Sequence, residues 1–301
     1  MLLGSICYAT TSAQDDVAKG VQLSEFVINA QAMGFDVDSF VHQVMTDTTF
    51  YHAFLNTKFH PHRVESGLRV RNKEEKETAT LYRDGHLVRN GPMAELVLDS
   101  VGELGRLRDR KGEMRYLTAE MYDEVFFPKG PYRASNRIVN RKMELDRRSR
   151  FDRYKSELKM FMFNPGTEIA SVPFIGDKMA LFDPAMVPHY DLTLWHDERN
   201  GRGCWVFSAD AKKDSDEDDT VIKTMDTWFD QATGQVIARE YRIAHSSIIL
   251  DFDIAIIVDN AVIDGTLVPT RVYYDGLWNV PFKKPEIVRF YLDMSEWWTY
   301  R

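Results

Sequence analysis

The stretch SSIILDFDIAIIVD, residues 246–259, constrains the fold more than any other part of the chain. Alternate residues from Ile248 to Val258 are apolar, and the intervening positions include Asp251 and Asp253. This alternation predicts a long β-strand with one buried face, because successive side chains of a strand point to opposite sides of its sheet. The two aspartates are then expected to face water, although paired carboxylates can also act as a general acid and base.

The rest of the chain separates into helices first and strands later. Residues 24–59 carry apolar side chains at helical spacing, whereas strands and turns follow one another from residue 189 onward. Helices and strands do not alternate as they would around a parallel sheet. The sequence therefore predicts an α+β fold over residues 14–301: a large curled antiparallel sheet, or incomplete β-barrel, covered by N-terminal and inserted helices.

The apolar side of this sheet is the candidate ligand-binding site. Burying one large apolar side chain contributes about 1.5–3 kcal/mol, so a face this apolar must be covered by core or by ligand. The predicted cavity lining consists of Leu250, Phe252, Ile254, Ile256, Val268, Val272, Tyr274, Val288, Phe290 and Leu292 from strands, with Phe50 and Phe54 from the helices.

The region between the early helices and the main strands has a mixed pattern. Residues 62–91 alternate and carry turn signals at Asp84-Gly85 and Asn90-Gly91. Residues 92–101 have the apolar spacing of a short helix. A further helical turn is expected from residue 118, with Thr118 as its cap.

Two segments fall outside the sheet pattern. Residues 133–160 are rich in arginine and predict one or two helices with a solvated face, or alternatively a basic docking surface. Residues 1–13 resemble an export signal with a truncated start, cleaved before Gln14, and the alternative is an ordinary disordered N-terminus. An export signal implies a periplasmic or secreted protein.

Composition excludes several classes of protein. A net charge of −8 disfavours nucleic acid as a partner, since phosphate contacts need a basic surface. The sequence has no run of 18 apolar residues, so the chain is not expected to be transmembrane. Without residues 1–13, Cys204 is the only cysteine, which leaves no intrachain disulfide.

No catalytic, cofactor or metal site is predicted. The sequence contains no glycine-rich phosphate loop, G-x-S-x-G or H-E-x-x-H motif. The acidic run at 214–219 lacks the glycine and the final glutamate of a calcium loop. His189, His196 and His245 are scattered near strand ends, so a hydrolase that combines them with aspartates is a weaker hypothesis.

Three motifs of the C-terminal half resemble the periplasmic lipoprotein carriers of the Lol type. They are TWFDQATGQVIAREYRI, DGTLVPTRVYYDG and VRFYLDMSEW, within residues 158–298. The resemblance implies an incomplete antiparallel barrel that is capped by helices and holds lipid. The chain is longer than a minimal carrier, and no cavity arginine can be assigned among Arg69, Arg71 and Arg83. The segments DTTFYHAFLNTKF and RYLTAEMYD also resemble exported proteins of Bacteroidetes-like bacteria.

Two functional hypotheses follow. The first is a non-enzymatic, exported carrier that holds a lipid or an acylated protein in its half-barrel. The second is a non-catalytic structural or interaction module of the cell envelope, in peripheral contact with envelope proteins through the arginine-rich segment and the C-terminal EWWTYR.

Overall fold

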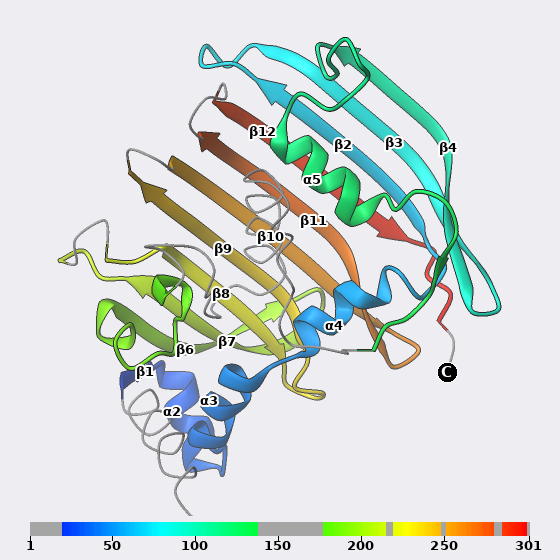
Figure 1. The fold of residues 1–301 in the computed structure, drawn as a ribbon. Coiled ribbons are helices and arrows are strands. Elements are labelled where there is room, and N and C mark those ends of the chain that lie inside the picture. Colours follow the sequence, from blue (N-terminus) through cyan, green and yellow to red (C-terminus); the bar gives the residue numbers. More distant parts are fainter. Residues whose placement is uncertain (1–19, 138–176, 215–218, 248–250, 280–284, 300–301) are drawn as a thin grey trace, which may run out of the picture.

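A single curled sheet of twelve strands dominates the molecule, as Figure 1 shows for the computed structural model. The structure describes residues 20–137, 177–214, 219–247, 251–279 and 285–299. The strands are β1 (Val21–Leu23), β2 (Arg63–Arg71), β3 (Glu77–Asn90), β4 (Met93–Gly105), β5 (Tyr132–Arg133), β6 (Tyr190–Arg199), β7 (Arg202–Ala211), β8 (Ile222–Asp230), β9 (Val236–Ser246), β10 (Asp251–Ile263), β11 (Thr266–Asn279) and β12 (Glu286–Ser295). The helices are α2 (Glu25–Ala32), α3 (Val37–Thr46), α4 (Thr49–Asn56) and α5 (Leu117–Phe126), with short 3-10 turns at Asp177–Met179 and Val187–His189.

Strand order follows the sequence, with two exceptions: β1 lies next to β6, and β12 lies next to β2. From β6 to β12 each strand pairs with the next, and β12 then pairs with β2, which continues to β3, β4 and β5. All pairs are antiparallel apart from β1, which lies parallel to β6 at one end of the sheet. The ends of the order, β1 and β5, do not pair, so the barrel is open. The predicted α+β fold with a large curled sheet is confirmed.

The helices lie on one side of the sheet (Figure 1). Helix α4 contacts β9 and β11, α5 contacts β12, and α2 contacts β1 and β6. We call this side the helix-covered face and the opposite side the outer face. Phe252, Ile254, Ile256 and Val258 of β10 lie on the helix-covered face and are at most 2% exposed. These alternating apolar residues of the stretch 246–259 therefore belong to the core of the molecule.

Two local predictions between residues 80 and 105 are wrong. Residues 92–101 form most of strand β4 rather than a helix, because hydrogen bonding to β3 outweighs their helical spacing. Asp84-Gly85 lies inside β3 at a bulge rather than in a turn. A Cβ atom at Gly85 would lie 2.4 Å from the carbonyl oxygen of Val97, so glycine at this position allows β3 and β4 to approach each other closely.

The cap of helix α5 also differs from the prediction. Thr118 is the second residue of the helix rather than its cap, and its hydroxyl does not cap the helix. Instead the carboxylate of Glu286 on β12 accepts hydrogen bonds from the backbone N–H groups of Leu117 (2.7 Å) and Thr118 (3.0 Å). A carboxylate at the positive end of a helix is favourable, so a distant strand fixes the start of α5.

Several predictions fall wholly or partly outside the described residues. They concern the export signal at 1–13, Leu250, and the arginine-rich segment beyond residue 137. The start of that segment is described and is not helical, since Arg133 belongs to β5. In the part of the chain that is described, no helix combines the length and the apolar character needed to span a bilayer.

The turn between β8 and β9 explains the D-x-x-T-G motif. One carboxylate oxygen of Asp230 accepts hydrogen bonds from the backbone N–H groups of Ala232 (2.9 Å) and Thr233 (2.8 Å), and the other accepts from Arg202 (2.6 Å). Gly234 follows with a positive φ of 69°, and its carbonyl oxygen accepts a hydrogen bond from Gln43 of α3. The motif thus builds the surface on which the N-terminal helices dock.

Replacing Asp230 by alanine is expected to lower the free energy of unfolding by about 1.5–3 kcal/mol, because hydrogen bonds to a buried charged group are lost. Urea denaturation measures this change. Asp226→Ala, on the outer face of the same strand, is the control. Asp226 helps to raise the pKa of Asp210 after burial does, so its removal relieves like-charge repulsion and leaves stability unchanged or slightly higher.

The stability that Asp230 contributes should also depend on pH. Burial opposes ionisation of Asp230, but hydrogen bonds from Arg202 and Thr233 outweigh it and hold the pKa of the carboxyl below its ordinary 3.8. Its stabilisation is therefore complete above that value and disappears as the pH falls below it. The Asp230→Ala variant should show a flatter dependence of stability on pH below roughly 4, and parallel curves would contradict the assignment.

Candidate ligand-binding site

The helix-covered face is built of cross-strand rows of buried side chains. Strand register places Ile256 opposite Tyr274 and Tyr274 opposite Phe290, and Val272 lies opposite Leu292 in the next row. The described residues of the predicted lining on this sheet are all 2% exposed or less: Phe252, Ile254, Ile256, Val268, Val272, Tyr274, Val288, Phe290 and Leu292. Val268 differs from the others: it lies beyond the bulge at Thr270 of β11, opposite Ala261, and outside the main packed cluster.

Helix α4 covers this face with two rings that the sequence analysis named. Phe50 and Phe54 are 2% and 5% exposed and lie edge to face, with their centroids 5.3 Å apart. Hydrogen bonds hold both ends of the helix. Asp47 accepts from the backbone N–H of Thr49, and the Asn56 side chain donates to the carbonyl oxygen of Leu267 on β11 (2.7 Å).

Helix α5 covers the neighbouring part of the face through aromatic contacts. Tyr122 stacks on Phe290, with centroids 3.9 Å apart, and meets Tyr274 edge to face at 5.3 Å. Asp123 forms a buried ion pair with Arg83 of β3, whose guanidinium also lies 4.3 Å from the centroid of Phe127. Thus α5 is fixed by one ion pair, one cap and a stack of rings.

The interface beneath α5 contains a buried hydroxyl group without a hydrogen-bond partner among the described residues. It is the hydroxyl of Tyr122, whereas the hydroxyls of Thr118 and Tyr274 interact with each other. Burial raises the pKa of both tyrosines, so these groups are neutral. An unsatisfied buried polar group costs about 1–3 kcal/mol, so the closed position of α5 is less stable than its apolar contacts alone imply.

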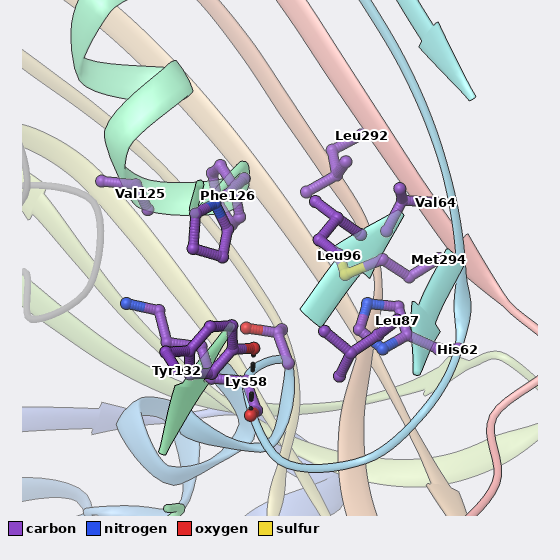
Figure 2. A pocket seen from close by; sticks show the side chains of 12 residues that line it. Lys58, His62, Val64, Leu87, Leu96, Val125, Phe126, Tyr132, Leu292 and Met294 are labelled. Carbon is purple, nitrogen blue, oxygen red and sulfur yellow. Dashed lines mark hydrogen bonds between the residues drawn. The ribbon is translucent and has the colours of Figure 1, made fainter. Parts of the chain in front are cut away.

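A small pocket lies where α5 ends (Figure 2). Its apolar lining comes from Val64, Leu87, Leu96, Val125, Phe126, Leu292 and Met294, and its polar lining includes Lys58, His62 and Tyr132. Tyr132 closes one side by donating a hydrogen bond to the carbonyl oxygen of Lys58. Burial lowers the pKa of His62 to about 4, so this imidazole is neutral at pH 7. The volume open to a water molecule is only about 10 Å³, room for about one water.

Apolar side chains continue from this pocket to the edge of the sheet. Leu96 packs on the core, and Leu98, two residues further along the same face of β4, is 40% exposed. Val101 opposite Arg83 is 52% exposed. Both side chains are exposed on the side of β4 that carries the partly buried Leu96. We call Leu98 and Val101 the apolar lip.

A second hollow, of about 620 Å³, is open and polar. It lies at the ends of strands β7 to β10, and its lining includes Lys212, Lys223 and Arg242. Lys212 and Lys223 donate to carbonyl oxygens, Arg242 pairs with Asp253, and Lys213 also lines the hollow. A lining with these four cations suits an apolar ligand less well than the helix-covered face does.

The outer face carries cross-strand ion pairs between arginine and aspartate. They are Arg242–Asp253, Arg271–Asp293 and Arg289–Asp275, each with a closest N–O distance of 2.7 Å. Asp251 and Asp253 are both partly exposed on this side. The prediction that these two aspartates face water is confirmed, and Asp253 serves to pair neighbouring strands.

The three histidines of the hydrolase hypothesis have different surroundings. His189 lies 3.7 Å from Asp219, His196 contacts the ring of Trp205, and His245 contacts Phe252. Within the described residues, no group of three or more histidine, cysteine or acidic side chains is arranged to hold a metal ion. The one described cysteine, Cys204, is buried and reduced.

Sequence reasoning missed two charged residues on the helix-covered face. Arg239 lies on β9 between Ile237 and Tyr241, which are buried on the same side, and it is itself only 7% exposed. Glu286 begins β12 and is 3% exposed. For Arg239 the signal was present, because Ile237, Arg239, Tyr241 and Ile243 occupy alternate positions of one strand.

Comparison with known proteins gives only distant likenesses. No family model matches the chain, and no curated protein matches it. Solved structures that are similar to it include the following three. A putative outer membrane lipoprotein-sorting protein domain from Vibrio parahaemolyticus is 10% identical with a TM-score of 0.26, over 82% of this chain and 90% of that one. A LolA superfamily protein from Nitrosomonas europaea is 10% identical at 0.24, over 83% and 94%. A DUF1329 family protein from Desulfovibrio piger is 11% identical at 0.23, over 84% and 93%.

Two of these three structures are described in the terms of the group that the sequence motifs resemble, and the third is described only by its family label. TM-scores near a quarter carry no information on ligand or mechanism. Function is therefore inferred from the residues of this chain.

Proposed function

We propose that this protein is an exported carrier that binds the acyl chain of a lipid or of an acylated protein between the sheet and helices α4 and α5. The observation that carries the proposal is the way α5 covers the sheet. An apolar face is closed by a helix of ten residues, and the buried hydroxyl of Tyr122 in this interface has no hydrogen-bond partner among the described residues. Single elements of a fold can open locally at less cost than global unfolding, and the proposal requires such an opening of α5.

The path of the ligand follows from the apolar lip. Leu98 and Val101 lead from solvent to Leu96 and then to the small pocket beside Val125 and Phe126. Because this pocket holds about one water, an acyl chain can enter only if α5 moves away from the sheet. The chain would then replace α5 as the cover of Phe290 and Leu292, and burial of its methylene groups would drive binding.

A matched pair of variants on one strand tests this path. Leu98→Asp, on the helix-covered side of β4, is expected to weaken binding of a fluorescent fatty acid at least tenfold, because a carboxylate would stand in the apolar lip. Val97→Asp, on the outer face, is the control. Val97 and Leu98 are similarly exposed, at 38% and 40%, so the two variants differ in the face that receives the carboxylate. Titration of the probe gives both dissociation constants.

Equal affinities of the two variants for the fluorescent fatty acid would show that the ligand does not enter past the apolar lip. Failure of the unmodified protein to bind the probe, or to retain lipid on purification, would reject the carrier and favour the interaction module instead.

A further inference from the structure

Arg239 is a buried cation, and no carboxylate among the described residues forms an ion pair with it. Its Nε donates a hydrogen bond to the hydroxyl of Thr227 (3.1 Å), and its guanidinium lies 4.3 Å from the centroid of Phe50 on α4. Asp47 attracts its charge but forms no ion pair with it. Burial lowers the pKa of this guanidinium, yet an arginine stays charged at physiological pH.

Other arginines whose side chains reach a neighbouring strand or helix form ion pairs. Arg83, the second buried arginine of the helix-covered face, forms its ion pair with Asp123. Arg199 on the outer face binds Asp259 and Glu240, each at 2.8 Å. Within the described residues, Arg239 forms no such ion pair. An uncompensated buried charge is costly, so a fold that keeps one is expected to use it.

Strand register gives Arg239 a specific place on the face. It lies opposite Val258, and the same row continues across the sheet through Val272, Leu292 and Ser66 to Arg83. The three residues next to Arg239 in this row are apolar and at most 1% exposed. With strands about 4.8 Å apart, Leu292 is about 14 Å from Arg239 across the sheet. Leu292 also lines the pocket at the end of α5.

We propose that Arg239 recognises an oxyanion head group, so that the ligand is a single-chain amphiphile with its charged end at Arg239 and its acyl chain along Val258, Val272 and Leu292. This inference rests on the proposed function and adds the chemical class of the ligand. The planar guanidinium already uses Nε for Thr227, which leaves its terminal N–H groups to bind a carboxylate or a phosphate. Phe50 lies over the guanidinium and would shield the new ion pair from water.

The test uses the full chain and displacement of a neutral naphthylamine probe by palmitate, methyl palmitate and hexadecyl phosphate. Unmodified protein is expected to bind at least one of the two anionic ligands tenfold or more tightly than the ester. Whichever anion is stronger identifies the head group as carboxylate or phosphate. In Arg239→Met the preference should fall to about one, with the affinity for methyl palmitate unchanged.

Two further variants separate recognition from folding. Arg242→Met alters the outward-facing, ion-paired arginine of the same strand and should keep the preference for anions. Arg239→Gln retains a donor for Thr227 and should lose the preference as the methionine variant does. The thermal midpoint of Arg239→Met should equal or exceed that of the unmodified protein, because an unpaired buried charge is removed.

The outcomes distinguish the two proposals. Equal affinity of the unmodified protein for ester and anions, or a preference that survives in both Arg239 variants, overturns the role of Arg239 and leaves the acyl carrier intact. If neither the ester nor the anions displace the probe, the carrier itself is rejected, and the head-group inference with it.

Discussion

Replacing Asp123 with alanine is expected to lower the free energy of unfolding by about 3–5 kcal/mol, since it leaves the guanidinium of Arg83 buried without its partner. The side chains of Arg83 and Asp123 are 6% and 13% exposed, so water compensates little for the loss. The Nε of Arg83 already lacks a hydrogen-bond partner. Urea denaturation measures the change in stability, and hydrogen exchange of α5 shows whether the helix is released from the sheet.

Two controls define the origin of this effect. Lys129→Ala removes a second cation 3.6 Å from Asp123, but Lys129 is 87% exposed, so the expected loss is below about 1 kcal/mol. Combining Asp123→Ala with Arg83→Met should recover much of the stability, because neither charge is then left buried. If Asp123→Ala alone costs less than the Lys129 control, the ion pair does not hold α5.

Phe290→Ala is expected to cost about 3–5 kcal/mol of unfolding free energy, the usual range for deletion of a buried ring. Phe290 is 2% exposed, stacks on Tyr122, and lies in the row with Ile256 and Tyr274. The lost ring also opens space beneath α5, so exchange of the α5 amides should become faster. Thermal and urea unfolding report the first effect and hydrogen exchange the second.

The control for Phe290 is its neighbour on the opposite face. Arg289 is partly exposed and pairs with Asp275, so Arg289→Ala should change stability by no more than about 1 kcal/mol. Comparable losses in the two variants would mean that the helix-covered face is not the core of the molecule.

Local patterns predicted the faces of the strands well. Alternation along β10 and β12 identified the buried sides because each strand has one apolar and one polar face. The same rule failed at β4, where Val97 and Val101 have helical spacing but are held in a strand by β3. An edge strand with exposed apolar residues lacks the clean alternation that a half-buried strand shows.

Contacts between distant parts of the chain were beyond prediction. Glu286 caps α5 from 169 positions away in the sequence, and the residues around Leu117 do not indicate this contact. The pairing of β12 with β2 is equally non-local. The composition of the helix-covered face was only half predicted, since its buried apolar residues were identified from alternation but Arg239 among them was not.

The position of β12 between β11 and β2 has a consequence for how the molecule is made. Ile287 of β12 lies opposite Arg71 of β2. Strand β2 therefore lacks its partner on one side until almost the whole polypeptide has been synthesised. Such long loop closures slow folding. A chain that stopped short of Glu286 would carry two separate half-sheets, each with a bare hydrogen-bonding edge open to aggregation.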